Sequence, residues 1–470
     1  MPLGLGAVHA AGGPPASECA DGRTEEQGDS DGRLLSQAAE RAGGLPPLPG
    51  RRQRAPHLDA GGERGVVATN APLPGRRYAG LHHRERPRGA PRPAIHRGVS
   101  AGRRIAYLSL ETPKPGQASD THVGEIAGEL RRLGYAVELF ATRRGGASGS
   151  SSYAARLADY ARVQIALARR LPRFDVVYVR SHFAALPTAM MASLRGVPVV
   201  HEVNGKPNDV EVTYPALRRF APLFRRLYRL QYRRAAALVA VTEGLMDWAR
   251  TFAGHDRVLL VTNGANTDLF RPDGPAASME RHVVVFVGGL VAWHGIDTML
   301  AALGEDDWPD EVDLLVVGDG VERDKIERCA STKLRWLGRR PYDEIPSLLR
   351  AATAALCVIE NPGGRSSSGV APLKLFEAMA CGVPVIVSDL PFQADIVRAR
   401  ETGLVVPPGD PKALARAVAS LVGRPEEAAR LGRNGADYVA RKASWRMRAE
   451  QLDALFEGLP QARGRWSGSS

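Results

Sequence analysis

From Arg103 onward, short apolar runs alternate along the chain with longer amphipathic stretches. The runs are rich in β-branched residues, which is typical of buried strands; in the first half they read RRIAYLSL, AVELFA, DVVYVRS, VPVVHEV and AALVAVTE. The stretches between them repeat apolar residues at helical spacing, as in HVGEIAGELRRLGY and YAARLADYARVQIALARRL. Strands that alternate with helices of this length predict a parallel sheet with helices on both faces.

A polar stretch rich in Pro and Gly, Arg271 to Arg281, interrupts the alternation, which then restarts. Runs such as HVVVFVGGL, VDLLVVGDG, AALCVI and VPVIVSD predict a second set of strands. We therefore expect two Rossmann-like α/β domains, at residues 103–272 and 281–445, followed by a terminal helix at 446–460. Open parallel sheets bind ligands beyond the carboxyl ends of their strands, so a cleft between the domains is the expected site.

Basic charge concentrates ahead of the first domain. The chain of 470 residues has a formal net charge of +12, and residues 51–104 hold thirteen Arg against three acidic residues. This composition lacks the apolar residues that a core needs, so residues 1–102, like the tail 461–470, are expected to be disordered. Because Tyr78 is the one aromatic residue of the basic segment, specific nucleic-acid binding is not expected.

Cysteine placement and hydropathy indicate the cell compartment. The cysteines are Cys19, Cys329, Cys357 and Cys381, without metal-ligand spacing, which favours free thiols over a disulfide framework or a zinc site. No run approaches the roughly 18 apolar residues of a membrane span, and the first residues lack the charged start of a secretory signal. These features favour the cytoplasm.

Glycine turns follow three strands of the second half: Gly288-Gly289, Gly318-Asp319-Gly320 and Gly363-Gly364. Glycine lets a backbone approach a ligand closely, and amides at a helix start bind anions. Such turns on one sheet edge indicate a site for a diphosphate. Neither half has the GxGxxG fingerprint of a dinucleotide-binding dehydrogenase.

Glu377 lies in the apolar run LKLFEAMA, one helical turn after Lys374. One interpretation makes its carboxylate an ion-pair partner of Lys374 or an exposed helix charge, worth about 0.3 kcal/mol. The other has its two oxygens accept hydrogen bonds from both hydroxyls of a ribose. The residues alone leave both interpretations open.

The chain resembles the retaining glycosyltransferases of group 1 (family four), whose GT-B architecture has two facing Rossmann-like domains. The resemblance covers about Arg103 to Arg448 and is most specific from Val283 to Ser388, through VFVGGLVAWHGID, LLVVGDGVERDKIE and PLKLFEAMACGVPVIVSD. In the first domain, GQASDTHVGEIAGELRRLGYAVELF, DVVYVRSHFAALPTAMMASLRGVPVVHEVNG and TNGANTDLFRPD are similar to successive segments of the family.

This resemblance implies that Glu377 binds the ribose of a nucleotide-sugar donor. The family's first carboxylate falls eight residues earlier, where this chain has Gly369. Glu360, at the end of the preceding strand, is a substitute that a rearranged loop would bring to the sugar ring. The other donor-binding residues that the resemblance implies are Gly288, Gly289, Gly318, Gly320, Arg339, Leu373 and Leu375.

The family usually has an Arg after the glycine of its first turn and a Lys five residues further on, both beside the leaving diphosphate. Here these positions are Gly289 and His294. Fixed cations that face the developing charge stabilise a transition state by several kcal/mol. His294, Lys374 and Arg365 are candidate replacements; His294 is alternatively a helix-start residue without a charge role.

On the acceptor side, the resemblance implies Gly116, in the loop after the first strand, with His122 and His201. Where relatives often have a His near the reacting centre, this chain has Asn204, which donates a hydrogen bond but is not a base. His201 is alternatively a structural strand histidine. Retaining members are thought to pass the acceptor proton to a donor phosphate oxygen, so the reaction does not require a side-chain base.

The segment 214–234, YPALRRFAPLFRRLYRLQYRR, combines seven arginines with apolar residues near helical spacing. A basic amphipathic helix binds anionic membranes, and would bring the cleft to a lipid-linked acceptor on the inner membrane face. The alternative is a core-packed helix with a solvated face. Pro222 argues against the membrane interpretation, because a kink there would blur the apolar stripe.

The sequence therefore predicts a retaining, metal-independent glycosyltransferase with a nucleoside-diphosphate sugar as donor, an unidentified acceptor and no cofactor. Two alternatives stay open. A sugar-nucleotide epimerase of the same architecture would need converging acid and base residues, which the sequence does not reveal. A non-catalytic nucleotide-sugar-binding or scaffold protein is the other, and Gly289 and Gly369 favour it.

Overall fold

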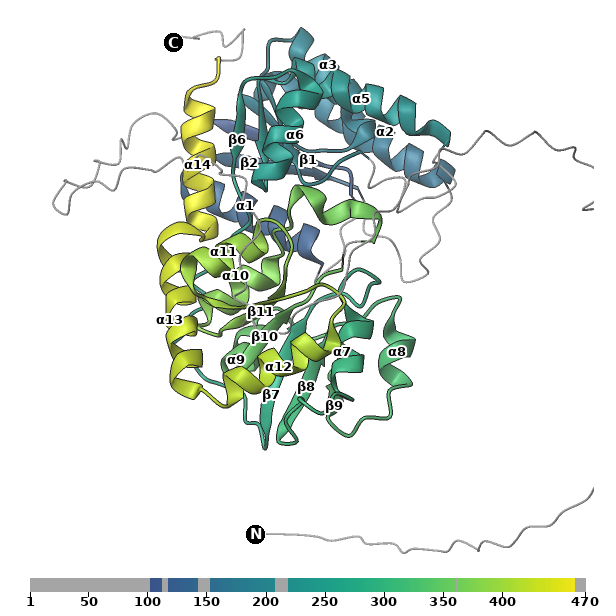
Figure 1. The fold of residues 1–470 in the computed structure, drawn as a ribbon. Coiled ribbons are helices and arrows are strands. Elements are labelled where there is room, and N and C mark those ends of the chain that lie inside the picture. The colour runs from purple at the N-terminus through teal and green to yellow at the C-terminus, as the bar shows by residue number, and fades with distance from the viewer. Residues whose placement is uncertain (1–101, 112–116, 143–152, 208–218, 361, 461–470) are drawn as a thin grey trace, which may run out of the picture. The chain divides into compact units, whose positions relative to one another are not determined.

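The computed structural model describes residues 102–111, 117–142, 153–207, 219–360 and 362–460 (Figure 1). The predictions made for residues 1–101 and 461–470, and for Gly116, lie outside these ranges. Within them, two parallel sheets covered by helices confirm the predicted two-domain α/β fold.

The first domain is a six-stranded parallel sheet of order β2-β1-β3-β4-β5-β6. Its strands are β1 (Arg104–Ser109), β2 (Ala136–Ala141), β3 (Val176–Arg180), β4 (Val199–Val203), β5 (Ala237–Ala240) and β6 (Val258–Leu260). The central strands β3 and β4 are buried along their whole length, as expected for parallel strands covered on both faces. Their register sets Arg180 beside Glu202 at the carboxyl edge.

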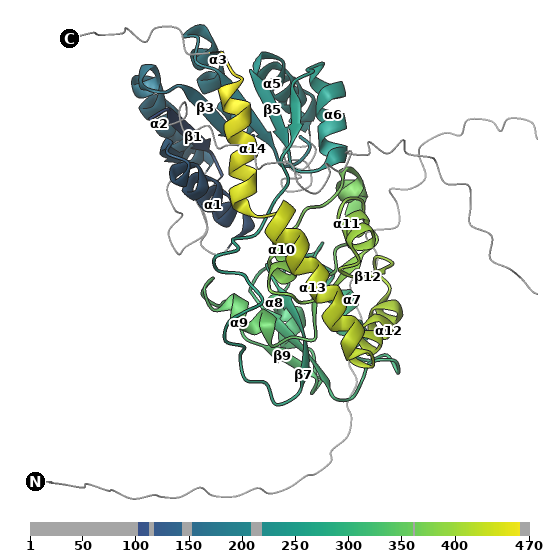
Figure 2. The same cartoon turned by 90° about the vertical axis from the view of Figure 1, so that its left-hand side faces the viewer.

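Helices cover both faces of this sheet. On one face lie α2 (Tyr153–Arg170), α3 (Leu186–Leu194), α5 (Ala221–Arg234) and α6 (Glu243–Ala253), each in contact with the next. On the other lies α1 (Ala118–Arg132), beside the last helix of the described chain, α14 (Trp445–Glu457) (Figure 2). Pro222 stands in the first turn of α5 and not in its interior, so it starts the helix without the expected kink.

The second domain is a parallel sheet of order β12-β11-β10-β7-β8-β9. The strands are β7 (His282–Val287), β8 (Val312–Val317), β9 (Leu334–Trp336), β10 (Ala354–Cys357), β11 (Val385–Ser388) and β12 (Gly403–Val406). α7 (Ile296–Ala302), α8 (Arg323–Glu327) and α12 (Pro411–Val422) pack on one face; α9 (Ile345–Arg350), α10 (Leu373–Ala380) and α11 (Gln393–Arg400) pack on the other.

The helix α13 (Pro425–Lys442) holds α10 from outside. Close packing requires glycine here, because a Cβ at Gly432 would lie 2.0 Å from the carbonyl oxygen of Gly382. The position of α10 is therefore fixed by the sheet beneath it and by α13 above it.

The chain crosses between the domains twice, and the crossings pair with each other. The amide of Ala265 donates to the carbonyl of Ala443 at 3.0 Å, and the amide of Trp445 donates back to Ala265 at 3.0 Å. After this pairing α14 packs on α1, where Trp445 and Phe456 are buried in the first domain's core. The terminal helix thus belongs structurally to the first domain.

Candidate functional site

The first two glycine turns of the second domain lie together at the carboxyl edge of its sheet, because β7 and β8 are neighbours. A Cβ on Gly318 would lie 1.8 Å from the carbonyl oxygen of Gly288, and one on Gly320 would lie 2.2 Å from that of Leu290. The second turn therefore packs directly against the first. This packing accounts for Gly318 and Gly320 without any ligand contact.

Lys374 places a buried ammonium beside the first turn. Its Nζ lies 3.9 Å from the centroid of the Phe286 ring. A Cβ on Gly288 would lie 3.1 Å from this nitrogen. No described residue hydrogen-bonds to this buried nitrogen. Burial lowers the pKa of Lys374 to about 8, against the opposing effects of Cys357 and Glu377. An anionic ligand at the turn would supply the missing counter-charge.

Glu377 is buried one turn further along α10, with 7% of its surface exposed. The Tyr342 hydroxyl donates to its Oε1 at 3.0 Å. Burial raises the pKa of Glu377 to about 7, while the Tyr342 hydrogen bond acts in the opposite direction. The carboxylate is neither exposed nor hydrogen-bonded to Lys374, so the interpretation as an ordinary helix charge does not describe it.

The position of the family's first carboxylate is tightly packed and has a backbone conformation that favours glycine. Gly369 has φ = +89°, and a Cβ would lie 3.1 Å from Cβ of Phe392 and 3.2 Å from Cβ of Thr242. Glu360, the suggested substitute, instead accepts a 2.7 Å hydrogen bond from the Thr298 hydroxyl at the start of α7. The structure thus gives a packing reason for Gly369 and a structural partner for Glu360.

His294 lies at the same turn as Lys374. Its Nδ1 is 2.6 Å from the carbonyl oxygen of Gly289, which places the proton on Nδ1, because the carbonyl can only accept. Its ring is 6.0 Å from the Phe286 ring, the ring that also contacts Lys374. At Gly289 the nearest atom to an added Cβ is 4.0 Å away, so this position is open.

In the first domain, Glu202 gathers five polar side chains at the carboxyl edge of the sheet. The partners are Tyr107 (3.2 Å), Tyr178 (2.9 Å), Arg180 (2.8 Å), Asn204 (2.7 Å) and His122 (2.9 Å). Burial alone would raise the pKa of Glu202, but His122, Arg180 and Asn204 together hold it well below its ordinary value. Glu202 is therefore an ionised acceptor.

His122 also connects this cluster to the second domain. Its Nδ1 lies 2.9 Å from Oδ1 of Asn263, and the Asn263 amide donates to the carbonyl of Ala371 at 2.5 Å. Ala371 lies two residues before α10, the helix of Lys374 and Glu377. The predicted residues His122 and Asn204 thus meet at Glu202, and the cluster reaches the start of the donor-side helix.

Three predicted residues are used for packing. His201 is fully buried on β4 with its ring 5.6 Å from that of Tyr232, and burial lowers its pKa to about 3. Leu375 is fully buried in the second domain's core, and Leu373 packs in the cluster that contains α1. All three side chains are buried, and for His201 this agrees with the structural strand histidine given above as the alternative.

The two remaining predicted donor-side residues are arginines, and the structure shows no ligand-binding environment around the one whose side chain it describes. Arg339 is exposed, with its Nε 3.8 Å from Asp319. Arg365 lies in the short 3-10 helix η4 (Pro362–Ser368), and its side chain lies outside the described residues. Among the described residues, no three His, Cys, Asp or Glu side chains gather as metal ligands do.

The sequence reasoning missed Tyr342, Arg180 and Glu202. A signal for the last two was present, since charged residues interrupt the apolar runs DVVYVRS and VPVVHEV, and buried charges are rare unless paired. Tyr342 gave no such signal, because it lies in a polar stretch remote in sequence from Glu377.

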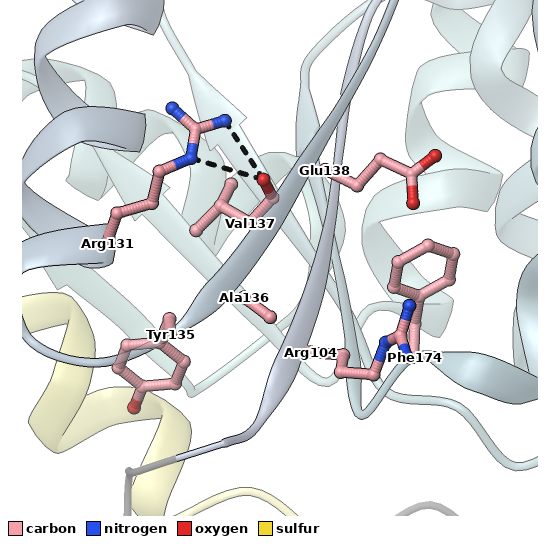
Figure 3. A pocket seen from close by; sticks show the side chains of 7 residues that line it. All are labelled: Arg104, Arg131, Tyr135, Ala136, Val137, Glu138 and Phe174. Atoms are coloured by element: carbon pink, nitrogen blue, oxygen red, sulfur yellow. Dashed lines mark hydrogen bonds between the residues drawn. The ribbon is translucent and has the colours of Figure 1, made fainter.

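A shallow pocket of about 310 Å³ lies at the amino edge of the first sheet, and Figure 3 shows its lining. Arg104 and Ala136 there are the first residues of β1 and β2. Arg131 is engaged with the carbonyl of Val137 at 2.9 Å. The pocket is at the opposite edge from the residues above, whereas open parallel sheets bind ligands at the carboxyl edge.

Comparison with protein families adds to this geometry. The model of Glycosyltransferase Family 4 matches residues 119–269, and that of Glycosyl transferases group 1 matches residues 271–438. The chain belongs to the group 1 glycosyltransferases. The predicted family is thereby confirmed.

This group 1 glycosyltransferase matches only part of the length of its curated relatives. It is 30% identical over 241 residues to a phosphatidyl-myo-inositol mannosyltransferase of Mycobacterium leprae, covering 50% of this chain and 62% of the relative. It is 28% identical over 226 residues to a D-inositol 3-phosphate glycosyltransferase of Corynebacterium glutamicum, covering 43% and 52%. The chain thus aligns with about half to three fifths of these relatives.

Solved structures share the fold of the group 1 glycosyltransferase. Sucrose-phosphate synthase of Thermosynechococcus elongatus matches with a TM-score of 0.63 at 20% identity, covering 76% of this chain and 98% of that one. HepE of Anabaena in complex with UDP-glucose matches with a TM-score of 0.56 at 19% identity, covering 76% and 100%. At this identity the likeness shows the fold alone.

Proposed function

We propose that this chain transfers a sugar from a nucleoside-diphosphate sugar to an acceptor hydroxyl, with retention of configuration and without a metal ion. The observation that carries the proposal is the buried ammonium of Lys374 at the β7 glycine turn, which has no hydrogen-bond partner among the described residues and lies one helical turn from the buried carboxylate of Glu377. A cation and a carboxylate at this spacing suit the diphosphate and the ribose of one nucleotide.

Each group has a distinct role in this proposal. Lys374 neutralises charge that develops on the diphosphate as the glycosidic bond breaks, and a cation that is buried and already in place is effective because no solvent has to reorganise. The open backbone position at Gly289, next to Lys374 at Gly288, lets phosphate oxygens approach. Glu377 accepts the ribose hydroxyls, with Tyr342 holding one carboxylate oxygen in place.

The comparisons support a nucleotide donor without selecting its base. HepE was solved with UDP and with UDP-glucose, and a relative from Mycolicibacterium smegmatis, 31% identical over 216 residues, is named as GDP-mannose-dependent. We therefore propose a sugar nucleotide as donor and leave the base to experiment.

Calorimetry with UDP, GDP, dTDP and ADP tests the donor site. We expect one of them to bind, and Glu377→Ala to weaken it at least tenfold, since a charged acceptor of two hydrogen bonds is lost. Glu450→Ala on the exposed side of α14 is the matched control. Absence of binding by all four nucleotides would contradict the proposal; binding that Glu377→Ala leaves unchanged would overturn the ribose assignment.

Product analysis tests the chemistry. The sugar nucleotide that matches the binding base should be hydrolysed slowly in the absence of acceptor, and proton NMR should show the released sugar first in the anomeric configuration of the donor. We expect EDTA to leave the rate unchanged, because Lys374 takes the place of a metal ion. Inversion of the anomer, or loss of activity in EDTA that Mg²⁺ restores, would contradict the corresponding part of the proposal.

We also propose that the acceptor is presented at an anionic membrane. α5 buries Ala221, Tyr228, Gln231 and Tyr232 and turns its arginines outward. The same helical layer carries five of the seven large exposed apolar side chains of the described chain: Leu157, Ile165, Leu194, Phe220 and Leu223. Arginines beside exposed apolar residues fit the interface of an anionic bilayer, and one relative is named for a phosphatidylinositol acceptor.

Flotation with liposomes tests the membrane proposal. At low salt the protein should float with vesicles that contain phosphatidylserine or phosphatidylinositol, and not with pure phosphatidylcholine. Arg225→Glu/Arg226→Glu should weaken vesicle binding by at least about tenfold, since each basic residue near the surface contributes about 1 kcal/mol. Protein that stays in the bottom fraction with anionic vesicles at low salt would overturn the proposal. No helix in the described ranges has the length and hydropathy of a membrane span.

A further inference from the structure

The orientation of the Asn204 side chain follows from its contact with Glu202. Nδ2 of Asn204 lies 2.7 Å from Oε1 of Glu202 and 3.4 Å from the Glu202 carbonyl oxygen. Both oxygens only accept hydrogen bonds, since the carboxylate is ionised. The atom that faces them must be the amide nitrogen. Oδ1 of Asn204 is therefore the atom left for a ligand, and no described residue donates to it.

Glu202 is held too firmly to turn away from Asn204. It is 1% exposed, and the adjacent strand sets Arg180 beside it in register. Arg180 is itself fixed by a second carboxylate, Glu111, at 3.2 Å. Two tyrosine hydroxyls, of Tyr107 and Tyr178, occupy the other carboxylate oxygen. A carboxylate with all of these bonds is a rigid support for the amide that it accepts from.

We propose that Glu202 is a positioning residue that turns Asn204 so that its Oδ1 accepts a hydrogen bond from a hydroxyl of the donor sugar. The inference rests on the proposed function. It reverses the expectation that Asn204 donates to the sugar, because the amide hydrogens are already used by Glu202. The donor side is favoured because His122 and Asn263 link the same carboxylate to Ala371, just before the donor-side helix α10.

The test compares a sugar nucleotide with its nucleotide. The Kd of UDP-glucose relative to UDP, or of GDP-mannose relative to GDP, isolates the contacts of the sugar from those of the nucleotide. Asn204→Ala should raise this ratio about fivefold to tenfold, the effect of one lost hydrogen bond, and leave the nucleotide's own Kd unchanged. Asn434→Ala, which removes an amide bonded to the Glu401 carbonyl on the far side of the second domain, should change neither value.

A second variant isolates the positioning role. Asn204→Asp keeps an oxygen at Oδ1 but cannot donate to Glu202, and the two carboxylates repel each other. If Glu202 sets the orientation, Asn204→Asp should raise the Kd ratio as much as Asn204→Ala does. Glu202→Gln should do the same, and adding Asn204→Ala to it should have little further effect. Should Glu202→Gln fail to fold, the two Asn204 variants still decide the question.

The outcomes separate this inference from the function on which it rests. If neither UDP nor GDP binds the unaltered protein, the proposed function fails. If one binds and Asn204→Ala leaves the ratio unchanged, Asn204 does not contact the donor sugar and the inference is overturned. If Asn204→Ala raises the ratio but Asn204→Asp retains the original value, Asn204 contacts the sugar without depending on Glu202.

Discussion

Lys374 and Glu377 lie one turn apart with opposite formal charges, and burial is the main influence on both. Burial raises the pKa of Glu377 to about 7 and lowers that of Lys374 to about 8. Both groups therefore change charge close to physiological pH. A nucleotide would favour the charged form of each, through ribose hydroxyls that donate to the carboxylate and through phosphate beside the ammonium.

Nucleotide binding should exchange protons, with a sign that depends on pH. Near pH 7 about half of Glu377 is protonated in the free protein, so binding should release protons. From pH 8 upward Lys374 is partly neutral, so binding should take protons up. Calorimetry in buffers of different ionisation enthalpy measures both. Glu377→Gln should abolish the release and Lys374→Met the uptake; a pH-independent exchange would contradict the assigned pKa directions.

The stability of a Gly369→Ala variant tests whether packing explains the glycine at the position of the family's first carboxylate. Gly369 and Gly409 both have positive φ, at +89° and +71°, but only Gly369 has neighbours within reach of a Cβ. Gly409→Ala should lower the free energy of unfolding by about 1 kcal/mol through backbone strain. Gly369→Ala should lose about 1 to 3 kcal/mol more through overpacking. Chemical denaturation gives both values, and equal losses would show that Thr242 and Phe392 do not restrict this position.

His201 affects the pH dependence of stability. Both ring nitrogens are buried without partners in the described chain, and burial lowers the pKa to about 3 from 6.5. The unfolded chain therefore binds one proton more between these values, so stability falls as pH falls through this range. His201→Leu should remove about 1.4 kcal/mol per pH unit from that slope and should not destabilise the protein at pH 7. Denaturation at pH 7, 6, 5 and 4 measures the slope; an unchanged slope would contradict a neutral His201.

At the scale of elements, the strands were predictable and some helices were not. Apolar runs such as RRIAYLSL and VPVIVSD match β1 and β11, because strands buried on both faces need continuous apolar sequence. α13 was missed because its sequence, PEEAARLGRNGADYVARK, is mostly polar, with few buried positions. α14 was expected, but its contact with α1 was not. Periodicity indicates that a helix has a buried face, but it does not indicate which surface covers that face.

The site shows the same division. The glycine turns and Lys374 were found from sequence because each lies in one local motif. The bond from Tyr342 to Glu377 and the cluster around Glu202 depend on strand order and register. Those relations join residues far apart in the sequence, so no local pattern records them. The reason for Gly369 was equally hidden from the sequence. A Cβ there would crowd Thr242 only because η4 packs on α6 of the other domain.

The contact between α6 and η4 joins the two domains and gives a prediction for elements. The Thr242 hydroxyl caps α6 through the Leu245 amide and donates to the carbonyl of Ser368 at 2.6 Å. A Cβ on Gly244 would lie 2.6 Å from the same oxygen. Gly→Ala in a helix normally stabilises by about 1 kcal/mol, but Gly244→Ala would push Ser368 away and should destabilise the protein.

Gly128 in α1 is the matched control, because nothing lies within 4 Å of its added Cβ. Gly128→Ala should raise the free energy of unfolding by about 0.5 to 1 kcal/mol. If α6 and Ser368 are in contact in solution, thermal and chemical denaturation should show a lower free energy of unfolding for Gly244→Ala and a higher one for Gly128→Ala. A stabilisation by Gly244→Ala equal to that of Gly128→Ala would show that the contact is absent.

At the scale of the whole described chain, the first domain is completed by the last helix. Trp445, Leu452 and Phe456 of α14 are buried among residues of α1 and the central strands. The Phe456 ring meets Tyr178 at 5.8 Å and Tyr135 at 6.0 Å. Tyr178 in turn donates to Glu202. The chain must therefore pass through the second domain and return before the cluster around Glu202 is fully packed.

Removing the Phe456 ring should consequently weaken the first domain and spare the second. Phe456→Ala should lower the free energy of unfolding by about 3 to 5 kcal/mol, as for other large buried side chains, while Glu450→Ala on the exposed side of α14 should change it by less than about 0.5 kcal/mol. Hydrogen exchange locates the loss. Protection should fall in β1, β3 and α1, whose residues share the cluster with Phe456, and persist in β8, which packs in separate clusters. Equal loss of protection in β8 would mean that the domains unfold as one unit, and that α14 stabilises both through the paired crossings at Ala265 and Ser444.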